Sequence, residues 1–289
     1  MDVSIVIVSW NVRDQLKKCI KSIYNNTHNL DYEIFVVDNC SSDHSTEMVQ
    51  NDYSKVKLIS NKVNFGFAYA CNQAIKKSRG NYILLLNPDT EVKQDSVVKM
   101  KDFMQNKKDC GIAGCKIVNF DGTIQPSVRK FPDIKSHLMI LLKIHNFITN
   151  SKSINSYYLK DFDYSKLQIV DQVMGAFYMI KRRVLQDIGL LDEHFYIWYE
   201  EVDLCKRAKL KSWNTYYNPE IEVFHYKGSS FSQVNPLKKQ YIFNRSMLYY
   251  FFKHENIFKY LVLLLVFPIS LFLSFIVQII GYHKKSKDL

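Results

Sequence analysis

Short apolar runs alternate with helically spaced apolar residues across residues 3–86, and this alternation limits the possible fold more than any other feature. The runs have the length and composition of buried strands, and they lie at Val3–Val8, Glu33–Val37, Val56–Ser60 and Tyr82–Leu86. Helices are predicted between them, at Asp14–Tyr24, Asp43–Gln50 and Phe67–Ser78. This order predicts an α/β fold in which helices cover both faces of a mostly parallel sheet.

The carboxyl ends of these strands form the predicted binding edge, because ligands of such sheets bind beyond those ends. Asp38 and Asp89 each follow a predicted strand, so both are expected at this edge. The fingerprint GxGxxG is absent, and the chain has only nine glycines. This composition argues against a dinucleotide-dependent oxidoreductase.

The pattern is weaker after the first four predicted strands. Ile134–Ile148 is apolar but interrupted by lysine and histidine. It predicts a helix that either lies at a membrane surface or docks on the core. Further along the chain, Val170–Ile180 predicts a strand and Arg183–Ile188 predicts a short helix.

Three carboxylates crowd into four positions beside two aromatic residues, in the order Trp198, Tyr199, Glu200, Glu201 and Asp203. Like charges held this close raise one another's pKa, and burial raises it further. A crowded carboxylate is therefore a candidate general base. The alternative is a helix N-terminus, where acidic residues favour the helix dipole. A second acidic element, Leu84–Glu91, ends an apolar run and is a candidate metal site.

Charge and cysteine content bear on the partners and the compartment. The net charge of +11 suits phosphorylated substrates, anionic lipid or nucleic acid. The basic residues form no single block and no nucleic-acid motif, so no nucleic-acid partner is expected. The six cysteines contain no CxxC pair, and Asp2 leads directly into the first strand without a signal peptide. We therefore expect a cytoplasmic catalytic domain with reduced thiols.

Residues 260–282 carry no charge and are mostly Leu, Ile, Val and Phe. This length is sufficient to cross a bilayer, although a buried core helix is the alternative. Basic residues flank the segment on both sides, and basic flanks prefer the cytoplasm. With Pro268 near the middle, we predict an in-plane or re-entrant helical hairpin whose two ends are cytoplasmic. A plain single span is the other possibility.

Five segments resemble glycosyltransferase family two, in the order found in that family. They are Ser4–Asn11 (SIVIVSWN), Glu33–Ser42 (EIFVVDNCSS), Asn64–Asn72 (NFGFAYACN), Leu84–Glu91 (LLLNPDTE) and Gly175–Arg207. The resemblance implies a GT-A fold and sugar transfer with inversion. The Asn-Pro-Asp form of the metal motif resembles the rhamnosyltransferase-like branch, which builds bacterial surface polysaccharides.

The resemblance also implies a divalent cation, Mn²⁺ or Mg²⁺, that neutralises the departing diphosphate. Asp89 matches the last acid of the family's DxD motif. Asn87 stands where the first acid usually is, which removes a charge. His225 matches a histidine that also binds the metal in some relatives.

The remaining implied roles concern the donor, the acceptor and the base. Asp38 resembles the acid that binds the nucleobase. The rest of the implied nucleotide-sugar site is Val8, Ser9, Asn11, Asn64, Gly66, Asn72 and Asn87. Glu201 occupies the position of the catalytic base, where the family usually has aspartate, and Glu200 is its competitor. Asp203 would orient a neighbouring group or cap the helix. Trp198 and Tyr199 would stack on acceptor sugars or pack in the core.

The predicted domains are a GT-A glycosyltransferase domain at 1–230, a helical connector at 231–259, and a membrane-associated hydrophobic helix with a basic tail at 260–289. Within the first domain, 1–115 would form the nucleotide-sugar-binding half and 116–230 the acceptor and catalytic half.

The implied donor is a UDP- or dTDP-sugar, with dTDP-rhamnose as one candidate. The acceptor would be a hydroxyl of a glycan or lipid-linked acceptor at the cytoplasmic face of the cell membrane. One alternative is a sugar nucleotidyltransferase, which needs a glycine-rich phosphate loop that Val8–Arg13 lacks. The other is a catalytically dead, membrane-tethered nucleotide-binding scaffold, which the departures at Asn87 and Glu201 keep open.

Overall fold

The computed structural model describes residues 1–148, 150–226 and 231–280. Its main sheet has ten strands, with the order β3-β2-β1-β4-β11-β6-β12-β5, while β7 pairs with β6 and β9 with β12. These strands are β1 (Val3–Ser9), β2 (Tyr32–Asp38), β3 (Lys57–Ser60), β4 (Tyr82–Leu86), β5 (Thr90–Val92), β6 (Cys110–Val118), β7 (Ile124–Gln125), β9 (Gln168–Val170), β11 (Phe177–Lys181) and β12 (Asn214–His225). The strands β1 to β4 pair in parallel, as predicted. The later strand β11 is antiparallel to both of its neighbours.

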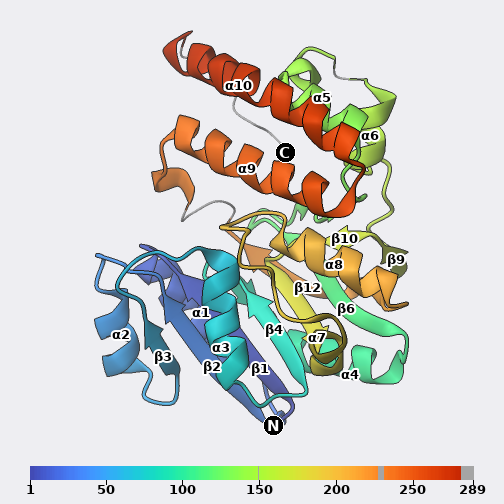
Figure 1. The fold of residues 1–289 in the computed structure, drawn as a ribbon. Coiled ribbons are helices and arrows are strands. Elements are labelled where there is room, and N and C mark those ends of the chain that lie inside the picture. Colours follow the sequence, from blue (N-terminus) through green and yellow to red (C-terminus); the bar gives the residue numbers. More distant parts are fainter. Residues whose placement is uncertain (149, 227–230, 281–289) are drawn as a thin grey trace.

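Helices cover both faces of the sheet, which confirms the predicted layers (Figure 1). One face packs against α1 (Arg13–Asn26), α2 (Ser45–Asp52) and α4 (Ser96–Asn106). The other packs against α3 (Phe67–Lys77), α7 (Arg182–Ile188) and α8 (Glu200–Leu210).

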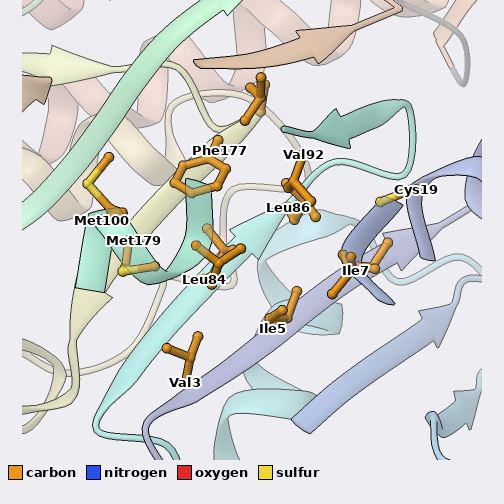
Figure 2. Close-up of a cluster of buried hydrophobic side chains, with 14 of the residues drawn as sticks. Val3, Ile5, Ile7, Cys19, Leu84, Leu86, Val92, Met100, Phe177 and Met179 are labelled. Carbon is orange, nitrogen blue, oxygen red and sulfur yellow. The ribbon is translucent and has the colours of Figure 1, made fainter. Parts of the chain in front are cut away.

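Alternate residues of the central strands supply the two cores, because successive strand side chains point to opposite faces. Ile5 and Ile7 belong to the first core cluster, together with Leu84 and Leu86 (Figure 2). Val6 belongs to the second. The central strands are therefore buried on both faces, which explains their nearly continuous apolar sequences.

The predicted strand Val170–Ile180 is wrong as a single element. The chain forms β9, then β10 (Gln172–Val173), which pairs with β8 (Val128–Arg129) in a separate small sheet, and then β11. At the break, the Asp171 carboxylate accepts a hydrogen bond at 3.2 Å from the backbone N–H of Phe131, which lies 40 residues away in the chain. The apolar pattern of residues 170–180 does not show that consecutive parts of this segment pair with different strands.

A helical layer lies over the carboxyl ends of the strands (Figure 1). It contains α5 (Ile134–Leu141), α6 (Lys152–Tyr157), α9 (Pro236–His254) and α10 (Ile257–Ile280). Of the two alternatives for residues 134–148, docking is the one observed, because α5 packs against α10 and buries Ile140 and Leu141. The predicted helix ends early, since Lys143 adopts a φ of 57° before a short 3₁₀ helix.

The apolar C-terminal helix α10 runs through Pro268 without reversing, so the predicted hairpin turn there is wrong. Proline removes one backbone hydrogen bond, but this loss leaves the chain direction unchanged. Within the described part of the chain, Ile257–Gln278 is the one helix long and apolar enough to cross a membrane, with a mean hydropathy of 2.7. Leu263 and Ser270 are buried against the layer, while much of the helix surface is exposed. The predicted basic tail lies outside the described residues.

Candidate active site

A cavity of about 350 Å³ opens at the carboxyl ends of β1 and β4, beneath the helical layer. It brings together many of the residues implied by the motifs, namely Val8, Ser9, Asn64, Gly66, Asn87, Asp89, Trp198 and His225. Residues that the sequence reasoning missed also line it, including Trp10, Asn39, Tyr196 and Lys238. We call it the donor cavity below.

Asp89 and His225 meet at the wall of the donor cavity. The pairing of β12 with β5 places His225 opposite Thr90, directly after Asp89. As a result, His225 Nε2 lies 3.3 Å from an oxygen of the Asp89 carboxylate. Both side chains are buried.

Gln125 fixes the orientation of the His225 ring. The Gln125 side-chain N–H donates to the backbone carbonyl of His225 at 2.8 Å, so its amide oxygen faces His225 Nδ1 at 2.9 Å. An amide oxygen only accepts, so Nδ1 carries the proton. Nε2 is the ring nitrogen that faces the Asp89 carboxylate. A partner of this kind, which orients a histidine, is typical of metal sites.

A carboxylate and an imidazole are suitable ligands for Mn²⁺. No group of three His, Cys, Asp or Glu side chains that could hold a metal occurs among the residues described here. Asp89 and His225 are thus two potential metal ligands that the fold brings together.

Ser9 and Asp38 stand side by side at the ends of β1 and β2. One Asp38 oxygen, Oδ2, accepts from the backbone N–H of Ser41, three residues further along the chain, at 2.9 Å. The other, Oδ1, is buried, as is Ser9 Oγ, and neither has a hydrogen-bond partner among the described residues. Buried polar atoms are normally paired. This edge therefore has unmet hydrogen-bonding capacity that a ligand can satisfy.

Gly66 brings two loops together at the floor of the cavity. Its φ of +90° is a left-handed conformation, and a Cβ atom there would lie 2.4 Å from the carbonyl oxygen of Tyr196. Asn64 accepts from the Gly66 N–H at 3.0 Å, and the Phe67 N–H donates to Tyr196 O at 2.6 Å. These contacts hold the Asn64 loop against the segment that leads to Trp198.

Three residues of the implied nucleotide-sugar site do not line the donor cavity, namely Asp38, Asn11 and Asn72. Asp38 lies beside Ser9, which does line it. The Asn72 amide donates to Leu191 O and to Glu193, each at 2.8 Å, and accepts from the Leu191 N–H. The Asn11 oxygen accepts from the Ser42 N–H at 2.7 Å. Both side chains hold neighbouring loops in place, and their contact with the nucleotide sugar stays a prediction.

A second cavity of about 310 Å³ adjoins the first, and we call it the acceptor cavity. The two share four lining residues, which are Phe67, Asn87, Ile197 and Trp198. Glu200 and Glu201 line the acceptor cavity, and so does Arg129 from β8. The predicted metal and base elements therefore lie on either side of Asn87 and Trp198.

The two glutamates differ in their surroundings. Burial raises the pKa of Glu200 well above its usual range, and the neighbouring charge of Glu201 raises it further. Burial also raises the pKa of Glu201, but the Arg129 guanidinium opposes that rise. Glu201 is half-buried, whereas Glu200 is 4% exposed. The Oε2 atom of each is buried and has no hydrogen-bond partner in the described part of the chain.

Trp198 and Tyr199 have different environments although they are adjacent. Both have positive φ values, 65° and 71°, which cost bulky residues about 1–3 kcal/mol each. Tyr199 is buried, and its hydroxyl lies 3.0 Å from Nε2 of His137. Trp198 is half-buried and borders both cavities. Of the two predicted acceptor residues, Tyr199 is therefore part of the core, and Trp198 is the one at the site.

Asp203 lines neither cavity and is completely buried. It accepts from Arg207 Nε, Lys253 Nζ and His254 Nε2, each at 2.7 Å. This network joins α8 to α9. Asp203 therefore holds α8 against α9 in this structure, and its part in catalysis stays a prediction.

Comparison with known proteins agrees with this geometry. Residues 4–189 match the family described as Glycosyl transferase family 2. The rhamnosyltransferase WbbL of Escherichia coli K12 is 27% identical over 233 residues, covering 78% of this chain and 83% of that protein. The N-acetylglucosaminyl-diphospho-decaprenol L-rhamnosyltransferase of Mycobacterium tuberculosis is 23% identical over 237 residues, covering 78% and 76%.

A solved structure supports the fold. The mannosyltransferase PcManGT from Pyrobaculum calidifontis, in complex with GDP-Man and Mn²⁺, matches with a TM-score of 0.60 and 13% identity, covering 99% of this chain and 76% of that one. The GT-A type of fold predicted from the motifs is confirmed. The matched segment covers more than half of the 289 residues, so this protein belongs to glycosyl transferase family 2.

Proposed function

We propose that the protein is an inverting, metal-dependent glycosyltransferase that uses a UDP- or dTDP-sugar, with dTDP-rhamnose as one candidate donor. The acceptor is a hydroxyl of a glycan or lipid-linked acceptor in surface polysaccharide synthesis. One observation carries the proposal. Two adjoining cavities meet at Asn87 and Trp198, with the Asp89–His225 pair in one and Glu201 in the other. A donor and an acceptor bound in these cavities would meet at that junction.

The donor end of the proposal rests on six residues. Asp89 and His225 would hold Mn²⁺ or Mg²⁺, which when bound neutralises the charge of the diphosphate leaving group. The unpaired Oδ1 of Asp38 suits the N3–H of uracil or thymine, and Ser9 Oγ is available to the same base. Asn64 and Gly66 lie where the ribose and the diphosphate would pass.

Glu201 is the proposed general base. It takes the proton of the acceptor hydroxyl as the hydroxyl oxygen attacks the anomeric carbon and the bond to the nucleoside diphosphate breaks. Its pKa is raised less than that of Glu200, because Arg129 favours the ionised form. A base must be ionised to act, so Glu201 is favoured over Glu200. Trp198 provides an aromatic face on which the acceptor sugar can stack.

Membrane attachment through α10 completes the proposal. Its exposed face carries large apolar side chains such as Leu261, Leu265 and Phe272, while its other side packs on α9 and α5. A helix held in this way suits insertion along the cytoplasmic surface of the membrane. The M. tuberculosis relative is named for a decaprenol-linked acceptor, which supports a lipid-linked acceptor here.

The rival functions make different predictions. Membership of a glycosyltransferase family argues against the nucleotidyltransferase. The dead scaffold predicts nucleotide binding without turnover. Release of nucleoside diphosphate from UDP- and dTDP-sugars, measured with Mn²⁺ or Mg²⁺, separates it from the enzyme.

The matched pair Glu201→Gln and Glu200→Gln tests the assignment of the base. Glu201→Gln should keep donor binding and lower turnover about 100-fold or more, the range of general bases. Glu200→Gln should retain most of the turnover. If Glu200→Gln abolishes turnover while Glu201→Gln remains active, the two roles are reversed. If no donor is turned over by the parent enzyme, the proposed function fails.

A further inference from the structure

An apolar groove of about 610 Å³ runs between the start of α9 and the far end of α10. Its lining residues are Asn235, Leu237, Lys238, Tyr241, Leu271, Phe272 and Phe275. Phe272 is 62% exposed, and Phe275 and Tyr241 are each 48% exposed. Contiguous exposed side chains of this size mark an interaction surface.

The groove adjoins the donor cavity through α9. Leu237 and Tyr241 line the groove, Ile242 lines the donor cavity, and Lys238 lines both. The donor cavity in turn shares Trp198 with the acceptor cavity. An elongated ligand in the groove can thus reach the site of transfer without leaving the protein surface.

The charge at the junction is positive. Lys238 is exposed, and it forms no ion pair with any residue in the described ranges. The first turn of α9 contains Lys238 and Lys239 and no acidic residue. A helix dipole disfavours positive charge at the N-terminal end of a helix. An anionic partner bound there would offset this unfavourable interaction.

We propose that the groove binds the polyisoprenyl chain of a lipid-linked acceptor, with Lys238 bound to the phosphate or diphosphate at the head of that chain. The inference rests on the proposed function and adds to it the site of the acceptor lipid. The apolar side chains match a hydrocarbon chain, and the lysine at the end of the groove nearest the cavities matches its anionic head. The sugar beyond the diphosphate is then directed towards Trp198 and Glu201.

Continuity with the membrane surface favours a lipid over a soluble apolar ligand. Phe272 and Phe275 belong to the same exposed face of α10 that includes Leu265 and Leu261. A chain embedded in the membrane can enter the groove along this face while remaining in contact with apolar groups. This route avoids the free-energy cost of exposing the chain to water.

Direct binding to the full-length protein tests the proposal. The probes are a radiolabelled C20 polyisoprenyl diphosphate and the C20 alcohol with the same chain. The variants are Lys238→Gln, with Lys239→Gln as its control, and Phe272→Gln, with Phe258→Gln as its control. Phe258 is 72% exposed at the other end of α10 and does not line the groove.

Lys238→Gln should weaken binding of the diphosphate about tenfold or more, the effect of losing one charge-assisted contact. Its affinity for the alcohol should be unchanged. Phe272→Gln should weaken both probes, and the two controls should bind like the parent protein.

Three results would overturn the proposal. The first is that the parent protein does not bind the diphosphate probe. The second is that Phe272→Gln and Phe258→Gln lose the same amount of probe affinity. The third is that Lys238→Gln loses affinity for the nucleotide but binds the diphosphate probe as the parent does. Nucleoside diphosphate binding, measured in parallel, distinguishes these results from a failure of the proposed function, which would remove nucleotide binding from the parent itself.

Discussion

At the scale of the residue, the ionisation of Glu201 reflects two opposing effects. Burial raises its pKa and the guanidinium of Arg129 limits that rise. Arg129 is itself half-buried, and its guanidinium lies 5.0 Å from the centre of the Tyr158 ring. Arg129 is therefore a candidate positioning residue that, together with a backbone hydrogen bond, favours the ionised form of the base.

Arg129→Met should move the acid limb of the pH–rate profile to higher pH. The ionised carboxylate is the active form, so activity falls as the pH drops through the pKa of Glu201. Removing a nearby positive charge raises that pKa, and the fall then begins at a higher pH. Turnover on the alkaline side should be largely retained. Lys130→Met, which removes the adjacent exposed charge, should leave the limb in place. An unshifted limb in Arg129→Met would show that Arg129 does not act on the base.

Local motifs predicted some site residues and could not predict others. Asp38, Asp89 and His225 each sit in a recognisable short sequence, and the structure places Asp89 against His225. Gln125 and Arg129 lie in two-residue strands without any motif, and they reach the site only through tertiary packing. No signal in the sequence alone would have found these two.

At the scale of the element, the joint between α8 and α9 depends on Asp203. Burial alone would raise the pKa of Asp203, but the hydrogen bond from His254 and the charges of Arg207 and Lys253 hold it below its usual range. The joint fixes α9 against the helix that carries both glutamates. Arg207 lies one helical turn after Asp203, whereas Lys253 and His254 lie about 50 residues away in the chain, so local spacing cannot show their contact with Asp203.

Asp203→Ala should lower the free energy of unfolding by about 3 kcal/mol, because it leaves buried cations uncompensated. The folded pKa of Asp203 is lowered, so its stabilising contribution is present at neutral pH and is lost as the pH falls through that pKa. Denaturant unfolding at several pH values should therefore show the difference between parent and variant shrinking in acid. Asp52→Ala removes an exposed ion pair with Lys17 and should have little effect. Equal stability of Asp203→Ala and the parent would refute this role.

Element prediction succeeded where the hydrophobic period was long and uniform. The strand at Tyr82–Leu86 has the predicted bounds, and the helix at Phe67–Lys77 ends one residue early. It failed at residues 170–180, because pairing partners are set by distant segments. It failed again at Pro268, because α10 keeps its direction while packed against α9 and α5.

At the scale of the whole molecule, the helical layer and the sheet enclose the site between them. The carboxyl ends of the strands face the layer (Figure 1), and α9 contributes Lys238 and Ile242 to the donor cavity. The exposed face of α10 is thus part of the same body as the catalytic residues. Attachment to a membrane would place the acceptor cavity near lipid-linked substrates.

Leu265→Asp should weaken binding to anionic phospholipid vesicles about tenfold or more, because burial of one leucine side chain is worth about 1.5–3 kcal/mol. Leu265 is 75% exposed, so the folded state should tolerate the change. Leu210, which is 71% exposed at the end of α8, provides the matched control Leu210→Asp. Vesicle co-sedimentation of the two variants measures the difference. Equal binding would exclude this face of α10 from the membrane contact.

The central claim is that the donor cavity binds a nucleoside diphosphate through a cation held by Asp89 and His225. Thermal unfolding with UDP, dTDP, GDP and ADP, each with and without Mn²⁺, tests it most directly, because a ligand that binds only the native state raises the melting temperature. We predict that Mn²⁺ together with UDP or dTDP stabilises the parent and that Asp89→Asn, with an unchanged baseline melting temperature, loses this response. Equal Mn²⁺-dependent stabilisation of parent and variant would contradict the account.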